Sequence, residues 1–154
     1  MCGIAGYFCK EQVRVSLIHK TLNIMKNRGP DNQDFRLFRT SGKERFVGLL
    51  HSRLSIIDLE PRSNQPFTIG ANTIVFNGEI YNYLELRYAL NKRGIVLNTS
   101  SDTEVLLHYF RIYGEKCVDF LEGMWAFAVY DSENETLFLS RDRFAEKPLY
   151  YYEN

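Results

Sequence analysis

The chain has 154 residues, about the length of one ordinary domain, so two independent catalytic domains do not fit. Hydrophobic residues make up 45% and charged residues 25%, which excludes a disordered, collagen-like or low-complexity protein. The 19 Lys and Arg balance the 19 Asp and Glu without a basic run, so we expect neither nucleic-acid binding nor a membrane partner. No apolar stretch approaches the roughly 20 residues of a membrane span, and the cysteines lack paired spacing, so we expect a cytoplasmic domain.

The first half of the chain predicts strands around one helix. Residues 3–9 are apolar and bounded by polar residues, as in a buried strand, and apolar residues then recur at helical spacing from Val15 to Met25. Further strands are predicted at residues 35–39, 45–50 and 73–76. Two weaker stretches, residues 32–45 and 60–72, carry turn residues and are interpreted as loops or short strand connections. The last of these strands should end in a sharp turn at Asn77-Gly78, a pair that favours positive φ.

The second half predicts two capped helices and a hairpin. The helices are expected at residues 83–93 and 102–113, each closed by a glycine. Asn82, three residues before Glu85, and Ser101, three residues before Glu104, are the expected caps at their starts. After a short helical piece at residues 115–121, the strand at 124–130 is apolar on both faces, so we expect it to be covered on both sides. Strands at 136–140 and 149–152 complete an α+β layered domain, with sheet packed on sheet and helices outside.

Cys2 has the greatest chemical interest. If Met1 is removed, the Cys2 thiol and a free α-amine belong to one residue, and an amine with an ordinary pKa of about 8 can accept the thiol proton. No histidine partner is then required. Taken alone, however, a cysteine here is more often a small residue that begins a buried strand.

The other cysteines and the histidines predict no further site. Cys9 and Cys117 each lie in an apolar segment and are interpreted as structural. His19, His51 and His108 are scattered without metal-ligand spacing, so we assign no metal site. His51 is close enough to Arg53 to orient a site, but a structural histidine is the more common role.

Several motifs that follow one another along the chain favour a catalytic role for Cys2 over a structural one. Besides Met1-Cys-Gly-Ile-Ala-Gly6 they are Arg28-Gly-Pro-Asp31, His51-Ser-Arg-Leu-Ser-Ile-Ile-Asp58, Asn77-Gly-Glu-Ile-Tyr-Asn82, Ser101-Asp-Thr-Glu104, Gly123-Met-Trp-Ala-Phe-Ala-Val-Tyr-Asp131, and Arg141-Asp-Arg-Phe144 with Lys147-Pro-Leu-Tyr150. In this order they resemble the glutaminase domain of class II glutamine amidotransferases, in the asparagine synthetase branch. The likeness covers nearly the whole chain.

The resemblance implies a fold and a set of catalytic residues. The fold is the four-layer αββα sandwich of the N-terminal nucleophile hydrolases, here expected to lack its final strands, with residues 1–154 forming the glutaminase domain. Cys2 matches the family nucleophile, which attacks the side-chain amide of glutamine. The side-chain amide of Asn77 and the backbone N–H of Gly78 match the oxyanion hole, where losing one donor costs on the order of 10²–10³ in rate.

The resemblance also implies how the substrate is held. Arg53 matches the arginine that grips the α-carboxylate of glutamine, and Asp102 with Glu79 matches the acidic residues that face the α-ammonium. Backbone groups would line the same pocket, from Leu54, Ile56 and Ile57. Without the resemblance, Asn77-Gly78 would be interpreted as a turn, Arg53 as a surface arginine and Asp102 as a helix cap.

Three other positions qualify this assignment. Arg28 is expected to hold the nucleophile strand in place rather than to touch substrate. Ser101 and Ala145 stand where family members usually have glycine. A β-carbon at Ser101 could shift the ammonium pocket, and Ala145 is strained if its φ is positive.

The expected partners are L-glutamine and an ATP-dependent synthetase domain or chain. The sequence has no ATP pyrophosphatase loop or P-loop, so ATP and Mg are expected only for that synthetase and no cofactor for this domain. Aspartate is the expected acceptor of the ammonia. A sugar or peptide acceptor and a non-catalytic glutamine-binding or interaction module remain alternatives. Exposed sheet edges also leave homodimer formation open.

Overall fold

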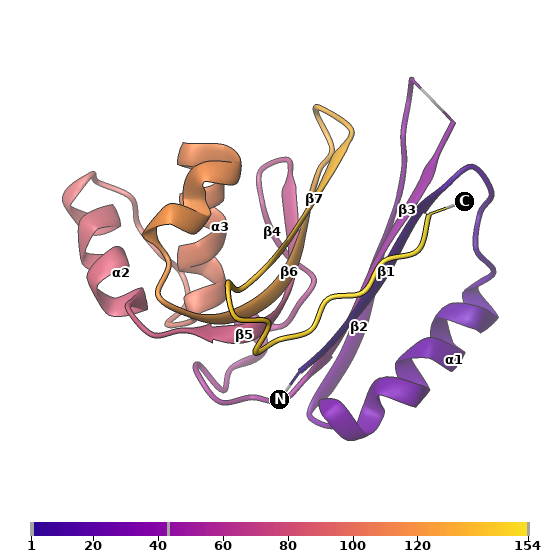
Figure 1. The fold of residues 1–154 in the computed structure, drawn as a ribbon, viewed down its shortest axis with the longest axis horizontal. Helices are drawn as coiled ribbons and strands as arrows, with labels where there is room; N and C mark the ends of the chain where they lie inside the picture. Colours follow the sequence, from indigo (N-terminus) through magenta and orange to yellow (C-terminus); the bar gives the residue numbers. More distant parts are fainter. Residues whose placement is uncertain (1, 43, 154) are drawn as a thin grey trace.

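A computed structural model describes residues 2–42 and 44–153, which fold into four layers (Figure 1). Helix α1 (Val15–Met25) covers the outer face of a three-stranded sheet, and helices α2 (Tyr83–Lys92) and α3 (Asp102–Tyr113) cover the outer face of a four-stranded sheet. The inner faces of the two sheets pack against each other. The predicted αββα sandwich is therefore confirmed.

The three-stranded sheet has the order β1-β3-β2, with both pairings antiparallel. Its strands are β1 (Gly3–Cys9), β2 (Asn32–Arg39) and β3 (Phe46–Arg53), and the short 3₁₀ helix η1 (Lys26–Arg28) follows α1. In the observed register, Gly3 lies opposite Ser52 and Asn32 lies opposite Arg53. The start of β1 and the end of β3 therefore meet at one end of the sandwich.

The four-stranded sheet is also antiparallel and has the order β4-β5-β6-β7. Its strands are β4 (Phe67–Ile69), β5 (Asn72–Ile80), β6 (Gly123–Asp131) and β7 (Thr136–Arg141). The remaining elements are the 3₁₀ helices η2 (Pro61–Ser63) and η3 (Gly114–Phe120). Because β4 pairs only with the first residues of β5, the later part of that β5 edge has no strand beside it.

Strand β6 shows why the core has two compartments. Trp125, Phe127 and Val129 belong to the cluster packed under α2 and α3, whereas Ala128 and Tyr130 pack between the two sheets. Alternation along the strand sends successive side chains to opposite faces. The prediction that this strand is covered on both sides is confirmed. A third, smaller cluster lies between α1 and the three-stranded sheet.

The predicted turn at Asn77-Gly78 is wrong, because β5 continues through both residues to Ile80. Gly78 is needed there for a different reason. A Cβ at Gly78 would lie 2.2 Å from the Met124 carbonyl oxygen and 2.8 Å from the Trp125 Cα. Glycine therefore permits the close approach of β6 rather than a change of chain direction.

Two other local predictions also need correction. Residues 149–152 do not form a strand, because no described strand pairs with them, and Tyr150, Tyr151 and Tyr152 are 79–89% exposed. Asn82 precedes α2 but does not cap it through its side chain, which bonds instead to the Phe120 carbonyl and the Glu122 N–H. A sequence pattern cannot distinguish such a distant partner from a local cap.

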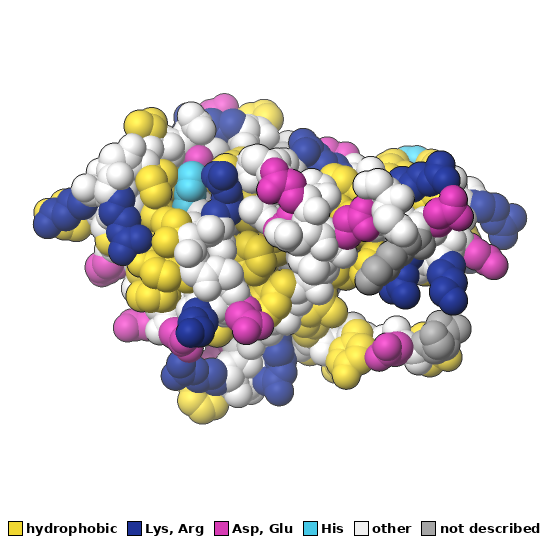
Figure 2. All heavy atoms as spheres, turned by 90° about the horizontal axis from the view of Figure 1, so that it is seen from above, with side chains coloured by type: hydrophobic (Ala, Val, Ile, Leu, Met, Phe, Trp, Pro, Cys, Tyr) yellow, Lys and Arg dark blue, Asp and Glu magenta, His cyan; other side chains and the backbone are white. Residues whose placement is uncertain are grey.

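The surface agrees with the balanced composition. On the face shown in Figure 2, basic and acidic side chains are interspersed with polar and apolar ones, and neither charge gathers into one large patch on this face. Among the described residues, no helix combines the length and apolar character needed to cross a membrane.

Candidate functional site

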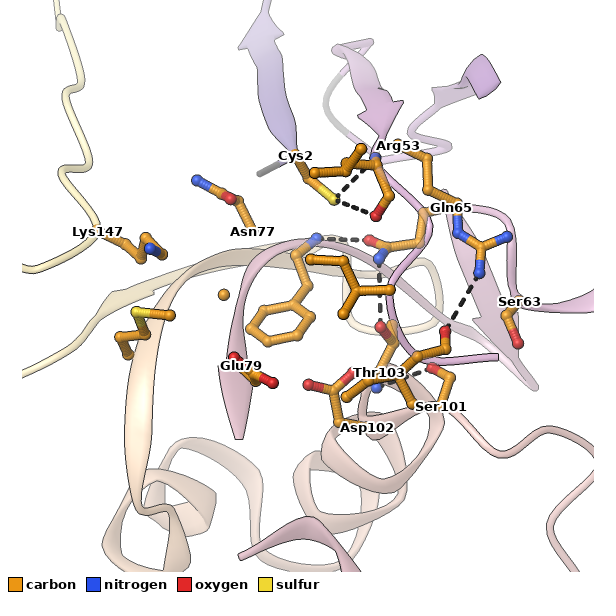
Figure 3. A pocket seen from close by; sticks show the side chains of 16 residues that line it. Cys2, Arg53, Ser63, Gln65, Asn77, Glu79, Ser101, Asp102, Thr103 and Lys147 are labelled. Atoms are coloured by element: carbon orange, nitrogen blue, oxygen red, sulfur yellow. Dashed lines mark hydrogen bonds between the residues drawn. The ribbon is translucent and has the colours of Figure 1, made fainter. Parts of the chain in front are cut away.

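A pocket opens at the end of the sandwich where β1 begins and β3 and β5 end (Figure 3). All nine residues that the sequence assigned to the site line this pocket. Its lining consists of Cys2, Arg53, Leu54, Ile56, Ile57, Ser63, Gln65, Phe76, Asn77, Gly78, Glu79, Ser101, Asp102, Thr103, Met124 and Lys147. Arg28 is not among them and lies beside Gly3 at the start of β1.

Cys2, directly before β1, is held in place by Leu54, the first residue after β3. The Leu54 N–H donates to the Cys2 Sγ at 3.4 Å, and the Sγ lies 3.7 Å from the Leu54 carbonyl oxygen. Burial raises the pKa of the Cys2 thiol, although the Leu54 N–H and the charge of Arg53 act in the opposite direction. The thiol is therefore protonated at neutral pH. Met1, whose removal would free the Cys2 amine, lies outside the described residues.

The strand-free edge of β5 presents one unused backbone donor to the pocket. The Phe76 N–H donates to Gln65 Oε1 at 2.6 Å, and the Ile80 N–H donates to Asp102 Oδ2 at 3.1 Å. Because N–H groups two residues apart in a strand point the same way, the Gly78 N–H lies between these two. No described residue accepts a hydrogen bond from it. The Gly78 N–H is thus available to a ligand.

Asn77 supplies a second unused polar group. Its side chain is only 7% exposed, and its buried Oδ1 has no hydrogen-bond partner among the described residues. Leaving a buried polar group unpaired costs about 1–3 kcal/mol, so folding alone does not explain this residue. Figure 3 shows Asn77 and Cys2 at the same end of the pocket.

Arg53 is a buried cation without a carboxylate partner. Its guanidinium donates to Asn64 Oδ1 at 2.7 Å and to the Glu60 carbonyl at 3.1 Å. It also donates to the carbonyls of Ile57 and Asp58. No described Asp or Glu forms an ion pair with it, so its charge remains available to an anion in the pocket.

The opposite end of the pocket is acidic. Asp102, the first residue of α3, is buried beside Glu79, and neither carboxylate forms an ion pair with a described residue. Burial raises the pKa of Asp102 to about 6, and the nearby charge of Glu79 adds to this, although the Ile80 N–H opposes it. A cation bound here would relieve the repulsion between the two carboxylates.

Gln65 is a pocket residue that the sequence interpretation missed. It joins the Phe76 N–H to the Thr103 hydroxyl, which accepts from Gln65 Nε2 at 3.2 Å, and so connects β5 to the start of α3. In the sequence Gln65 stands in a polar stretch that predicted only a loop. Its burial, which depends on residues far along the chain, was the missing signal.

Two other titratable residues, His51 and Cys117, are buried outside the lining of the pocket. Burial lowers the pKa of His51 to about 4, and its Nε2 bonds to the Phe76 carbonyl at 3.2 Å, so this histidine is neutral and bridges the two sheets. Burial also raises the pKa of Cys117 to about 12, and neither Cys117 nor Cys9 lines the pocket. Across residues 2–42 and 44–153, no cluster of His, Cys, Asp or Glu is arranged to hold a metal ion.

The two departures from the family pattern behave differently. Ser101 has an ordinary φ of −78°, and its hydroxyl caps α3 by accepting the Thr103 N–H at 3.0 Å. Its β-carbon therefore causes no backbone strain. Ala145 has a φ of +59°, so the strain expected for a non-glycine residue at that position is present.

Comparisons with known proteins agree with this geometry. A family model described as a glutamine amidotransferase domain matches residues 1–154. Two Bacillus subtilis (strain 168) proteins, asparagine synthetases [glutamine-hydrolyzing] 1 and 3, are 40% and 38% identical to this chain over 158 residues. The matches cover 98% of this chain but only 24% and 25% of those relatives, so the chain spans about a quarter of their length.

A solved structure shares the fold. Glutamine phosphoribosylpyrophosphate amidotransferase from B. subtilis superposes with a TM-score of 0.66, over 90% of this chain and 37% of that chain. Its sequence identity is 20%, so this likeness concerns architecture alone. Because the family model spans residues 1–154, the chain belongs to the glutamine amidotransferase domain family.

Proposed function

We propose that this chain hydrolyses L-glutamine to L-glutamate and ammonia through a thioester on Cys2. The observation that carries the proposal is the composition of one pocket. It combines a thiol, the free backbone N–H of Gly78, the side-chain amide of Asn77, and opposite charges at separate places in its wall. A free α-amino acid with a side-chain amide carries the matching groups.

The charges of the pocket suit the head group of the substrate. The Arg53 guanidinium is proposed to attract the α-carboxylate by its positive charge, since its two Nη atoms already donate to oxygens of the protein. Asp102 and Glu79 are proposed to bind the α-ammonium. Backbone groups of Leu54, Ile56 and Ile57 would complete the wall around the aliphatic part.

The reaction needs a proton acceptor for a thiol that is protonated at neutral pH. After removal of Met1, the α-amine of Cys2 would take the thiol proton while Sγ attacks the amide carbon. The Asn77 amide and the Gly78 N–H would hold the resulting oxyanion. The C–N bond then breaks, the proton leaves with ammonia, and water attacks the thioester to release glutamate and restore the thiol.

We further propose that the ammonia serves an ATP-dependent amidation of aspartate by a synthetase domain or chain. The support is the name carried by the 40% identical relative, an asparagine synthetase [glutamine-hydrolyzing]. ATP and Mg would belong to that synthetase rather than to the pocket described here. A sugar or peptide acceptor would leave the chemistry at Cys2 unchanged.

A direct experiment separates hydrolysis from mere glutamine binding. Intact mass first establishes that Met1 is absent, and the protein is then treated with a glutamine-mimicking diazo ketone. We expect one covalent adduct, located on Cys2 by peptide mapping, together with release of glutamate from L-glutamine. A processed protein that binds L-glutamine but forms no adduct and releases no glutamate would instead be a binding module.

A further inference from the structure

Asp58 is an enclosed carboxylate next to the pocket that has no part in the chemistry proposed above. Its side chain is 2% exposed, yet it does not line the pocket. It lies in the segment that connects β3 to η2 and carries the pocket residues Leu54, Ile56 and Ile57. Its φ is +52°, a conformation that disfavours most side chains, so its neighbours must hold it in place.

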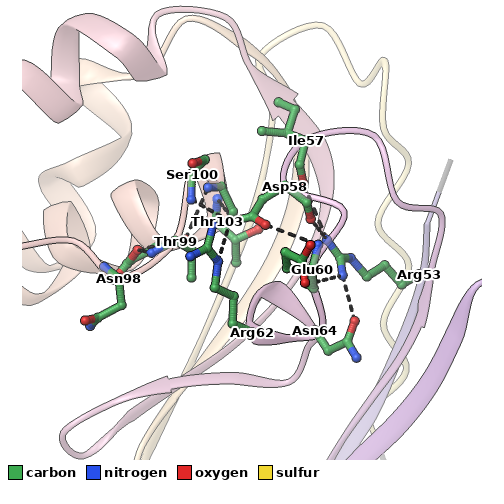
Figure 4. Close-up of polar contacts among 12 residues, drawn as sticks. Arg53, Ile57, Asp58, Glu60, Arg62, Asn64, Asn98, Thr99, Ser100 and Thr103 are labelled. Atoms are coloured by element: carbon green, nitrogen blue, oxygen red, sulfur yellow. Dashed lines mark hydrogen bonds and ion pairs between the residues drawn. The ribbon is translucent and has the colours of Figure 1, made fainter.

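One set of contacts connects Asp58 to the carboxylate-binding end of the pocket (Figure 4). The Asp58 carbonyl accepts a hydrogen bond from the Arg53 guanidinium. Its side chain accepts the Glu60 N–H at 3.2 Å, and the Glu60 carbonyl in turn accepts from Arg53 at 3.1 Å. Asp58 therefore shapes the ring of carbonyls that fixes the guanidinium.

A second set connects the same residue to the acidic end. Asp58 Oδ2 accepts the Ser100 N–H at 2.6 Å, which is the backbone group just before the Ser101 cap of α3. Asp102 follows directly in the chain. Arg62, itself largely exposed, donates to the same oxygen at 3.1 Å.

These contacts keep Asp58 ionised. Partial burial raises the pKa of its carboxyl, but the hydrogen bonds from Ser100, Ser63, Glu60 and Arg62 outweigh this and lower it to about 2. Charge-assisted bonds of this kind are roughly twice as strong as neutral ones. The bridge between the two ends of the pocket is therefore a strong one.

We propose that Asp58 is a positioning residue that sets the separation between the Arg53 guanidinium and the Asp102 carboxylate, and so selects for the α-amino-acid head group. The inference rests on the proposed function, in which these two residues bind the α-carboxylate and α-ammonium of L-glutamine. A ligand that bears only one of the two charges does not depend on their separation. A displacement of about 1 Å between binding groups can change rates on the order of 10²-fold.

Two substitutions test the bridge. Asp58→Asn keeps the shape and tolerates positive φ but removes the charge, whereas Asp58→Gly removes the side chain and relieves the backbone strain. The matched control is Asp131→Asn. Asp131 also accepts two backbone N–H groups, from Glu133 and Asn134, in a β6–β7 turn that is not part of the pocket.

Each variant is assayed with L-glutamine and with glutaramate, which keeps the carboxylate and the amide but lacks the α-amine. For Asp58→Gly we expect KM for L-glutamine to rise roughly 10- to 100-fold with a much smaller change in kcat. The preference in kcat/KM for L-glutamine over glutaramate should fall by about the same factor. Asp131→Asn should change neither the KM for L-glutamine nor the preference over glutaramate. In equilibrium dialysis, Asp58→Gly should bind labelled L-glutamate more weakly than the unmodified chain, and Asp131→Asn should bind it equally well.

The outcomes distinguish this inference from the proposed function. If the unmodified chain hydrolyses L-glutamine but the Asp58 variants keep its KM and its preference over glutaramate, the positioning role is overturned and the activity stands. An equal loss with both substrates would assign Asp58 a merely structural role and would also overturn it. If the unmodified chain hydrolyses nothing but binds L-glutamate in a manner that depends on Asp58, the bridge is supported and the proposed hydrolysis fails. If it neither hydrolyses nor binds, both fail.

Discussion

The Asp102 carboxylate accepts the backbone N–H of Ile80 at 3.1 Å, so the first residue of α3 also completes the hydrogen bonding at the end of β5. One side chain thereby serves the sheet and faces the pocket. Its environment is unfavourable for a charge, because burial and the proximity of Glu79 raise its pKa to about 6 from the ordinary 3.8.

Asp102→Asn should stabilise the protein while weakening substrate binding. A raised folded-state pKa means that the contribution of Asp102 to stability is fully present below about pH 4 and is lost as the pH rises through 6. The amide removes the buried charge and can still accept the Ile80 N–H. We expect the free energy of unfolding to rise by about 1–3 kcal/mol at pH 7.5 and little at pH 4, measured by urea titration. Asp131→Asn should instead lower the free energy of unfolding at pH 7.5, because hydrogen bonds lower the pKa of Asp131 despite its partial burial.

The pH dependence of KM should reflect the same residue. Binding of an α-ammonium needs an ionised carboxylate, so KM for L-glutamine in the unmodified protein should rise as the pH falls below about 6. In Asp102→Asn, KM should be at least roughly tenfold higher at pH 7.5 and should lose most of this dependence. Steady-state kinetics between pH 5 and 8 test this, and a KM that stays flat in the unmodified protein would contradict it.

Asn77→Ala should lower kcat by about 10²–10³ with little change in KM. The free energy of unfolding should not fall, because the substitution removes a buried oxygen that has no partner. Asn82→Ala provides the control, since its side chain bonds to Phe120 and Glu122 away from the pocket. Asn82→Ala should lose stability and keep kcat, whereas Asn77→Ala should lose kcat and keep stability. A loss of stability without a loss of kcat in Asn77→Ala would remove it from the oxyanion hole.

Cys2→Ala should abolish glutamate release and covalent labelling while retaining glutamine binding, because the head-group residues are untouched. Cys9→Ser is the matched control, since the Cys9 thiol donates to the nearby Glu11 carbonyl and does not line the pocket. We expect it to label and turn over like the unmodified chain. Labelling that persists in Cys2→Ala would place the nucleophile elsewhere.

Ala145→Gly should raise the free energy of unfolding by about 0.5–1 kcal/mol, because relief of a +59° φ exceeds the added entropy of the unfolded chain. Glu135→Gly offers the contrast at a similar φ of +52°. The Glu135 carboxylate accepts backbone N–H groups of Ser41 and Gly42, so its removal should destabilise. Thermal or urea unfolding distinguishes the two signs.

Periodicity was sufficient to predict most of the architecture. The strand at Gly3–Cys9, the helix from Val15 to Met25 and the two-faced strand β6 follow from local patterns of apolar residues. Local patterns were insufficient where contact with a distant element determines the backbone conformation. Asn77-Gly78 has the composition of a turn, but the approach of β6 keeps both residues within an extended strand.

The site was predictable only in part for the same reason. The resemblance to a family named nine residues, and all nine line one pocket, although their roles remain predictions. Gln65 was missed, and Asp58 was noted only as the last residue of a motif. Both residues act through contacts with Phe76, Thr103 and Ser100, which are 11 to 42 residues away in the sequence. A buried polar residue in a loop has no signature in composition or spacing.

The side-chain cover over the late part of β5 also bears on self-association. A bare strand edge is a template on which another molecule can extend a sheet, and this is a common route to aggregation. Here Gln65, His51 and Asp102 occupy the outward backbone groups of Phe76 and Ile80, so an incoming strand would have to displace buried partners first. The same arrangement leaves Gly78 open to a small molecule. This edge of β5 can thus bind a small molecule at Gly78, while pairing with a further strand is blocked.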